Sequence, residues 1–332
     1  MNNSVILFDI KKNCWEECSR PMPELTIDES LVKVEFAGLC GSDMHRIKAP
    51  TSHETQIVMG HEIIGTVEKS DKETLIGKKV VINPIANCGK CSYCNDGLTQ
   101  FCSNSRNIGK NIDGAFAKYL KVPNKSLYIV PENFQAELGV LVDGAAVIIN
   151  GIKKLSKKPH SVLVIGDGTV GCLSIAVLKA LYPEIKISLR GHHNTDYVNQ
   201  IYSTSVPQEN EKFDLTIETV GRAQSDTLNQ CVEYASIGGQ ILIMGVYPTN
   251  FSLDFNARTA FYKELAIYGV NSFCVTKKRD DFREALALID SHPAFFAPLI
   301  THKFLLSDFN LGIAKMLDKS KETVIKVIYT TA

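Results

Sequence analysis

Four cysteines within a span of fifteen residues have the spacing of a metal site. They are separated by two, two and seven residues, with Gly89 and Gly97 between them: Cys88, Cys91, Cys94 and Cys102. Four thiolates can surround one Zn²⁺ in a closed tetrahedral site, which stabilises a fold and leaves no position for a substrate. Four unrelated buried thiols and an iron–sulfur site are the alternatives. The density of the cluster favours zinc.

A second group of candidate ligands lies in two short segments nearer the N-terminus. Cys40 and His61 stand at the ends of separate strand-like runs, and both are ligand types that zinc accepts. A catalytic zinc keeps one coordination position open for water or substrate. Taken alone, Cys40 would be a core thiol and His61 a surface histidine. Beside the four-cysteine cluster, the metal interpretation is favoured for both.

A glycine-rich turn follows the apolar run 162–165 and opens a helical stretch at 170–181. Its candidate cofactor-binding residues are Gly166, Gly168, Thr169, Val170 and Gly171. Such glycines allow a tight turn and let backbone N–H groups approach a pyrophosphate at the helix N-terminus. The motif alone is weak, but the strand–turn–helix context supports dinucleotide binding. Asp167 is unusual beside a phosphate, so we expect its side chain to point away from the cofactor.

The elements that must position these residues change in kind along the chain. Short β-branched runs at 31–36, 63–67 and 79–82 predict an all-β barrel or sandwich. The apolar stretch 136–155 contains no proline and predicts a helix that leads into a second domain. From residue 161 onward, strands and helices alternate, which predicts a parallel sheet covered by helices on both faces.

Composition narrows the class of protein further. A length of 332 residues favours two domains. The formal net charge is zero and no basic run stands out, which argues against nucleic acid or an anionic membrane as a partner. No apolar stretch is long enough for a membrane span, and the N-terminus lacks a signal-peptide pattern. We therefore expect a cytoplasmic protein with reduced cysteines.

With these motifs in this order, the sequence resembles the zinc-containing medium-chain dehydrogenase/reductase family over nearly its whole length. Segments 113–119, 217–221, 238–241 and 298–304 carry the resemblance as well. It implies an α/β protein with a Rossmann doubly wound parallel sheet plus a mostly β, GroES-like catalytic domain. The expected boundaries are 1–145 for the catalytic domain, 146–274 for the Rossmann domain and 275–332 for the return to the catalytic domain.

The resemblance also implies a ligand set for a catalytic zinc. Cys40 and His61 match the first two ligands, and Asp143 occupies the place of the third, where the polyol branch of the family has Glu-Pro. Asp143 could instead be a helix N-cap. Asp43 matches the carboxylate that orients the zinc histidine. Glu62, beside His61, matches an alternate metal ligand.

Proton transfer and cofactor binding are implied in the same way. Ser42 and His45 match a relay in which the proton of the substrate hydroxyl passes through Ser42 and the cofactor ribose to His45 and water. For Ser42, and also for Asp43, ordinary turn chemistry is the alternative. Lys326 matches a basic position that pairs with the cofactor pyrophosphate, and the alternative is a solvated lysine.

Residues 189–193 contain no acid where NAD-binding Rossmann folds place one. Arg190 could instead pair with a 2′-phosphate, so NADP(H) is favoured and NAD(H) is possible. A solvated Arg190, or one stacked on adenine, is the alternative. The segment between Arg190 and Asp214 is shorter than in most members of the family.

These features predict an enzyme with two zinc ions per chain that transfers a hydride between NAD(P)(H) and an alcohol, aldehyde, ketone or polyol. The resemblance implies a homodimer or homotetramer. One alternative in the same fold is an NADPH-dependent reductase of an activated C=C bond or a specialised carbonyl. Another is a non-catalytic nucleotide-binding protein with only a structural zinc.

Overall fold

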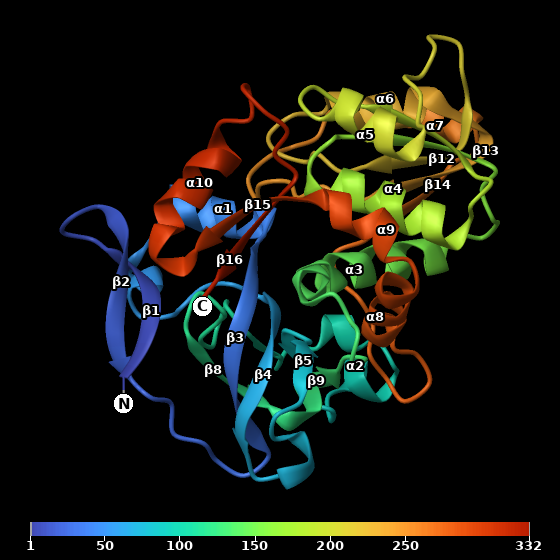
Figure 1. The fold of residues 1–332 in the computed structure, drawn as a ribbon. Helices are drawn as coiled ribbons and strands as arrows, with labels where there is room; N and C mark the ends of the chain where they lie inside the picture. The colour runs from blue at the N-terminus through green and yellow to red at the C-terminus, as the bar shows by residue number, and fades with distance from the viewer. Residues whose placement is uncertain (1, 332) are drawn as a thin grey trace.

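The computed structural model describes residues 2–331, in which the two largest sheets differ in kind (Figure 1). The first sheet is mostly antiparallel, with strand order β15-β16-β3-β4-β5-β9, and β8 pairs with β3. Its strands are β3 (Glu29–Leu39), β4 (Glu62–Ser70), β5 (Lys79–Ile82), β8 (Tyr119–Pro123), β9 (Leu127–Ile129), β15 (Ile300–Leu305) and β16 (Lys326–Thr330). Segments from both ends of the chain therefore build one sheet, as the predicted return to the catalytic domain requires.

An apolar core holds this sheet against the hairpin of β1 (Asn2–Asp9) and β2 (Cys14–Pro21) and against α10 (Phe309–Leu317). Three of its aromatic rings pack together: Phe116, Phe309 and Tyr329 have ring centroids 4.8 to 5.7 Å apart. β-Branched and aromatic side chains suit a pleated, half-buried surface, which is why these runs form strands. The predicted β domain is confirmed.

The second sheet is parallel, with strand order β11-β10-β12-β13-β14. Its strands are β10 (Ser161–Ile165), β11 (Lys186–Arg190), β12 (Phe213–Glu218), β13 (Ala235–Ile243) and β14 (Ala266–Gly269). Alternate residues of β10 face different helices. Val162 and Val164 join a core cluster with α4 (Thr169–Leu181), whereas Leu163 and Ile165 join a cluster with α6 (Asp226–Tyr234). Helices thus cover both faces, which confirms the predicted Rossmann architecture.

The predicted helix at 136–155 is divided into two parts. A 3₁₀ helix, η5 (Ala136–Leu141), precedes α3 (Val142–Lys154). In the 3₁₀ part Gly139 lies close against Ile64 and Val81, so the tighter turn packs on the β domain. The N-cap of α3 is Leu141, and no side chain caps this helix. The alternative that Asp143 is an N-cap is therefore wrong.

The short segment after β11 leaves the sheet with five strands. Helix α5 (Thr195–Tyr202) is followed by a stretch that pairs with β11 through a single bridge between Ser188 and Ser205. The Leu189 N–H donates to the Ser205 carbonyl at 2.8 Å. At this edge of the sheet, a single β-bridge therefore takes the place of a sixth strand.

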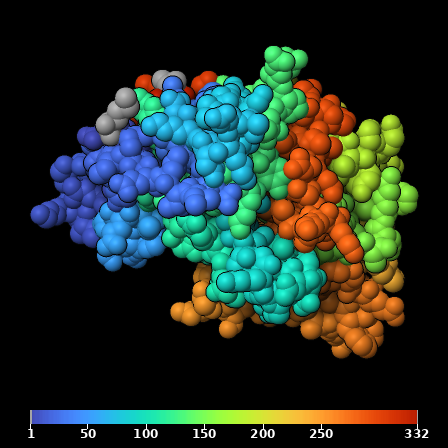
Figure 2. All heavy atoms as spheres, turned by 90° about the horizontal axis from the view of Figure 1, so that it is seen from below, coloured from blue at the N-terminus to red at the C-terminus, as the bar shows by residue number. Residues whose placement is uncertain are grey.

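The four-cysteine segment forms a lobe that contacts residues 272–281. The Cys274 thiol donates to the Gly97 carbonyl at 3.1 Å, and the Val275 N–H donates to the Thr99 hydroxyl at 3.0 Å. Figure 2 shows the teal residues of the lobe on the surface, beside orange residues that follow the Rossmann sheet.

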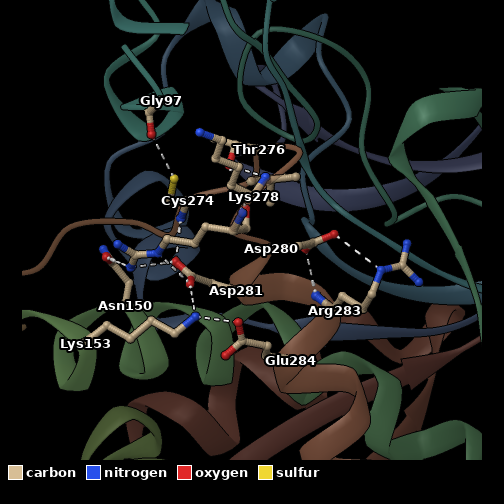
Figure 3. A network of polar contacts seen from close by, with 12 residues as sticks. Gly97, Asn150, Lys153, Cys274, Thr276, Lys278, Asp280, Asp281, Arg283 and Glu284 are labelled. Carbon is tan, nitrogen blue, oxygen red and sulfur yellow. Dashed lines mark hydrogen bonds and ion pairs between the residues drawn. The ribbon is translucent and has the colours of Figure 1, made fainter. Parts of the chain in front are cut away.

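A buried carboxylate ties this contact to the helices beneath it (Figure 3). Asp281 begins α8 (Asp281–Ser291) and is fully buried. It accepts hydrogen bonds from Arg279 and Lys153, both at 2.9 Å, and from the Cys274 N–H at 2.8 Å. Burial raises the pKa of Asp281, but these donors hold it below its usual value. The network links the lobe, α8 and α3 as one unit.

Across residues 2–331, no helix has both the length and the apolar character that a bilayer crossing requires.

Candidate active site

Three of the predicted metal-binding residues meet between the ends of two strands. One ligand atom from each of Cys40, His61 and Glu62 lies within 4.8 Å of the other two. Cys40 follows β3 and precedes α1 (Gly41–Lys48), and His61 precedes β4. Because β3 and β4 are antiparallel, with Gly38 opposite Glu62, the end of one strand meets the start of the other.

A glycine is required beside this cluster. A Cβ atom at Gly38 would overlap a carboxylate oxygen of Glu62 and press on the side chain of Lys326. The Lys326 ammonium pairs with that carboxylate and donates to the Leu39 carbonyl at 3.4 Å. Lys326 is fully buried, so the alternative of a solvated lysine is wrong. Its pairing with a cofactor pyrophosphate stays a prediction.

Asp43 lies behind His61, as its predicted role requires. Its Oδ1 is 3.3 Å from His61 Nδ1, and its Oδ2 accepts the Cys40 N–H at 3.1 Å. Burial lowers the pKa of His61, but Asp43 and Cys40 raise it well above its usual value. The site therefore attracts positive charge to the imidazole, and a divalent cation would displace the proton.

Asp143 shares this electrostatic environment from the first turn of α3. Burial raises its pKa to about 6, and Glu62 and Asp43 add to the rise, whereas His61 and Lys326 oppose it. Among residues 2–331, the group within 4.8 Å of one another comprises Cys40, His61 and Glu62 and does not include Asp143. Asp143 as third ligand stays a prediction. Glu62, expected from the sequence as an alternate ligand, lies within the group formed with Cys40 and His61.

The donor set fits a catalytic zinc. Thiolate, imidazole and carboxylate are all zinc ligands, and three protein ligands leave one position for water or substrate. The nearby carboxylates of Asp43 and Asp143 add negative charge, while Lys326 is the cation paired with Glu62. A divalent cation would neutralise the remaining negative charge of these carboxylates.

The two predicted relay residues lie on α1. Ser42 is exposed, and its hydroxyl donates to Cys40 Sγ at 3.3 Å, so it borders the cluster. His45 follows one turn later and is exposed to solvent. The helix therefore leads from the cluster to the surface.

The four-cysteine lobe is arranged around one point. All four sulfur atoms lie within 4.8 Å of one another, with 4.0 Å between Cys88 and Cys94 and 3.9 Å between Cys91 and Cys102. Tetrahedral zinc with bonds of about 2.3 Å separates its sulfur ligands by roughly 3.8 Å. Backbone N–H groups of Lys90 and Cys91 lower the pKa of Cys88 to about 6, which favours the thiolate. The alternative of four unrelated thiols is wrong, and a single metal ion fits.

The glycine motif is built as predicted between β10 and α4. Gly168 is the N-cap of α4, and Gly166 has a φ of 110°. A Cβ atom at Gly171 would overlap the Gly166 carbonyl, so the turn requires glycine there. The Thr169 hydroxyl donates to the Ile325 carbonyl, which ties the motif to the catalytic domain.

Known dehydrogenases are similar to this chain in sequence over most of its length. The family model of the alcohol dehydrogenase GroES-like domain matches residues 26–132. L-threonine 3-dehydrogenase of Pseudoalteromonas translucida is 26% identical over 325 residues, which cover 92% of this chain and 94% of the relative. The corresponding enzyme of Escherichia coli K12 is 27% identical over 332 residues, with the same coverage. These matches support the assignment of the chain to the zinc-containing medium-chain dehydrogenase/reductase family.

Solved structures confirm the fold of this dehydrogenase. A zinc-binding dehydrogenase from Sinorhizobium meliloti, bound to NADP, has a TM-score of 0.86 at 23% identity and 99% coverage of both chains. L-idonate 5-dehydrogenase from E. coli has a TM-score of 0.86 at 22% identity, covering 99% of this chain and 98% of the other. The chain is an oxidoreductase of the alcohol dehydrogenase type, as the sequence predicted.

Next to the glycine motif, Asp167 binds the loop that follows β11. The Asp167 carboxylate accepts the N–H groups of His193 and Asn194, both at 2.7 Å. Its side chain therefore holds the loop after β11. Arg190 is exposed, donates to the Tyr234 hydroxyl at 2.8 Å and lies 5.7 Å from the ring centroid. Tyr234 ends α6, whereas Arg190 ends β11, so no local pattern could have revealed this partner.

Proposed function

We propose that this dehydrogenase transfers a hydride between the CH–OH carbon of a small alcohol or polyol and NAD(P)⁺, and that it holds two zinc ions. The convergence of Cys40, His61 and Glu62 carries the proposal. Zinc bound there would lower the pKa of the substrate hydroxyl. The four-cysteine lobe would hold the second ion and support the fold.

The residues around the cluster have separate tasks in this proposal. Asp43 orients His61 through Nδ1, which fixes the other ring nitrogen for the metal. Ser42 accepts the proton of the substrate hydroxyl, because it borders Cys40 and is accessible. His45, exposed on the same helix, passes the proton to water. A nicotinamide cofactor held at the glycine motif would accept the hydride from the substrate carbon.

The decisive experiment is a substrate panel combined with metal analysis. Purified enzyme would be assayed with amino alcohols, polyols and simple alcohols in oxidation, and with aldehydes, ketones and enones in reduction, using both cofactors. We expect alcohol–carbonyl turnover and two zinc ions per chain. Turnover of enones alone would favour the C=C reductase. One zinc ion with no turnover would favour the non-catalytic nucleotide-binding protein.

We further propose that NADP(H) is the favoured cofactor. Arg190 is the last residue of β11, and its backbone carbonyl accepts the Gly166 N–H at 2.8 Å, so it lies beside the glycine motif. Arg190→Ala should lower kcat/KM with NADP(H) about tenfold or more and leave NAD(H) nearly unchanged. Tyr234→Phe, which removes the hydroxyl partner and keeps Arg190, is the matched control. A wild type that favours NAD(H), or equal losses with both cofactors, would contradict the proposal.

Self-association as a dimer or tetramer is part of the proposal. β14 is an edge strand that pairs with β13 alone among residues 2–331. Near this edge Ile237 is 81% exposed and Phe261 75% exposed, which is unusual for large apolar side chains. An uncovered, apolar sheet edge is a template for pairing with another chain. Light scattering that gives the mass of a monomer at micromolar concentration would contradict it.

A further inference from the structure

Arg46 on α1 contacts two segments that lie near the catalytic cluster. Its Nε donates to Glu54 Oε1 at 2.8 Å, and its Nη1 donates to the Gly109 carbonyl at 2.5 Å. Glu54 belongs to the 3₁₀ helix η1 (Ser52–Thr55), and Gly109 begins the loop 109–114. One side chain therefore ties α1 to both of these segments.

The ion pair of Arg46 and Glu54 is largely shielded from solvent. The side chain of Glu54 is 4% exposed and that of Arg46 is 24% exposed. Glu54 Oε2 accepts the N–H and the hydroxyl of Thr51, both at 2.7 Å, so both carboxylate oxygens have donors. Burial raises the pKa of Glu54, but Thr51 and Arg46 lower it to about 2. Glu54 therefore stays charged at neutral pH and holds the guanidinium in place.

The loop that Arg46 contacts packs directly on the residue before His61. A Cβ atom at Gly109 would overlap the Gly60 carbonyl oxygen, so the two backbones are in contact there. The Gly60 carbonyl also accepts the Ala115 N–H at 3.0 Å. A shift of this loop would therefore move the peptide group that leads into His61.

Helix α1 thus acts on His61 in two ways. Asp43 contacts the imidazole at Nδ1, and Arg46, three residues later, supports the backbone before it. Nη2 of Arg46 is buried and has no hydrogen-bond partner among residues 2–331, which is unfavourable. A lysine would avoid that cost if charge were all that Glu54 required. The contact with both Glu54 and Gly109 needs the planar fork of arginine.

We propose that Arg46 is a positioning residue for the catalytic metal site: it holds the loop 109–114 against Gly60 and so fixes the backbone that carries His61. The inference rests on the proposed function, since it presupposes a metal ion at the catalytic cluster. The alternative is that Arg46 only neutralises the buried charge of Glu54. The two roles differ in whether the second contact of the guanidinium matters.

The first test is a titration with Co²⁺, which accepts the ligands that zinc accepts and gives an absorbance when it binds the Cys40 thiolate. The full-length protein would carry zinc in the lobe and no metal at the catalytic cluster. Arg46→Met should raise the Kd for Co²⁺ about tenfold, because His61 is held less firmly. Arg46→Lys should raise it nearly as much, since an ammonium group cannot replace the fork. Lys48→Met, exposed on the same helix, is the matched control and should leave the Kd unchanged.

The second test is amide hydrogen exchange of the same protein before cobalt is added. The N–H groups of Gly114 and Ala115 donate to carbonyls of residues 58–60. In Arg46→Met and Arg46→Lys these two amides should exchange about tenfold faster than in the wild type, because the loop opens more often. In Lys48→Met they should exchange at the wild-type rate.

The outcomes separate this inference from the proposed function. A wild type that binds no cobalt at the catalytic cluster overturns both together. Wild-type cobalt affinity or wild-type exchange in Arg46→Met overturns this inference alone. Recovery of both by Arg46→Lys would assign Arg46 to the charge of Glu54 and would also overturn it. Should Arg46→Met not fold, the double variant Arg46→Met/Glu54→Gln, which buries no unpaired charge, takes its place in both tests.

Discussion

The two candidate metal sites of this dehydrogenase are built in opposite ways. The four-cysteine lobe takes all its ligands from fifteen consecutive residues and uses sulfur alone. The catalytic cluster takes Cys40 and His61 from different strand ends, and its surrounding charges come from α3 and from β16. A local site is specified by spacing, whereas a site assembled across a sheet depends on the whole fold. Loss of a ligand should therefore unfold the first and inactivate the second.

The largest effect is expected in the lobe. Cys91→Ser should prevent folding or lower the melting temperature by more than about 10 °C, because zinc binding in a closed site contributes folding free energy. The matched control is Cys18→Ser, a half-buried thiol on β2 outside both sites, which should change the melting temperature by a few degrees at most. Thermal denaturation of both variants checks this. A Cys91→Ser protein as stable as the control would contradict the expectation that loss of a lobe ligand unfolds the protein.

At the catalytic cluster the effect should be on the reaction. His61→Ala should lower kcat/KM by about a thousandfold or more, with a melting temperature close to that of the wild type, because the open site contributes little to folding. Asp43→Asn, which keeps the ligand but weakens its orientation, should cost roughly 10–100-fold. Steady-state kinetics and thermal melts test both variants. Unfolding of the His61→Ala protein would show that this site, too, supports the structure.

The third ligand can be assigned by metal content. Glu62→Gln should reduce the zinc from two ions per chain toward one, and Asp143→Asn should reduce it less, since Glu62 lies within the group formed with Cys40 and His61. Metal analysis after extensive dialysis measures this. The opposite order would make Asp143 the third ligand, as the resemblance implied.

The smallest effect is a pH dependence that only the catalytic cluster should show. The folded protein raises the pKa of Asp143 to about 6 from an ordinary value of 3.8. The stability that Asp143 contributes is then fully present below about pH 4 and is lost as the pH rises through 6. The comparison uses protein from which the catalytic zinc has been removed and in which the lobe zinc is retained. The free energy of unfolding of Asp143→Asn should then be about 1–3 kcal/mol higher than that of the wild type at pH 7, and the two should be equal near pH 4. Urea denaturation at both pH values checks this, and an equal difference at both would contradict it.

Much of the fold could be predicted because its signals are local. The apolar run 162–165 and the helical stretch at 170–181 correspond closely to β10 and α4, and the glycines between them form the expected turn. The 136–155 stretch shows the limit of such reasoning. Its apolar, proline-free sequence suits a helix throughout, but residues 136–141 form a 3₁₀ helix in which Gly139 lies close against Ile64 and Val81.

The site was predicted well in residue types and less well in partners. Cys40, His61 and Asp43 lie together as expected. The pairs Glu62–Lys326 and Arg190–Tyr234 join residues far apart in the sequence, and neither forms a motif. Pairwise contacts of this kind depend on strand order and helix packing, which spacing along the chain does not encode.

The pairing of Glu62 with Lys326 also sets an order of events during synthesis. The two residues are 264 positions apart, so β3 and β4 leave the ribosome long before β16 can join them. Since β15 and β16 complete the sheet of β3 and β4, the nascent N-terminal segment leaves the carboxylate of Glu62 without its lysine for many seconds. A zinc ion that binds in that interval would contact the Glu62 carboxylate before Lys326 pairs with it. The timing of metal supply relative to translation therefore bears on how much of the newly made protein matures as active enzyme.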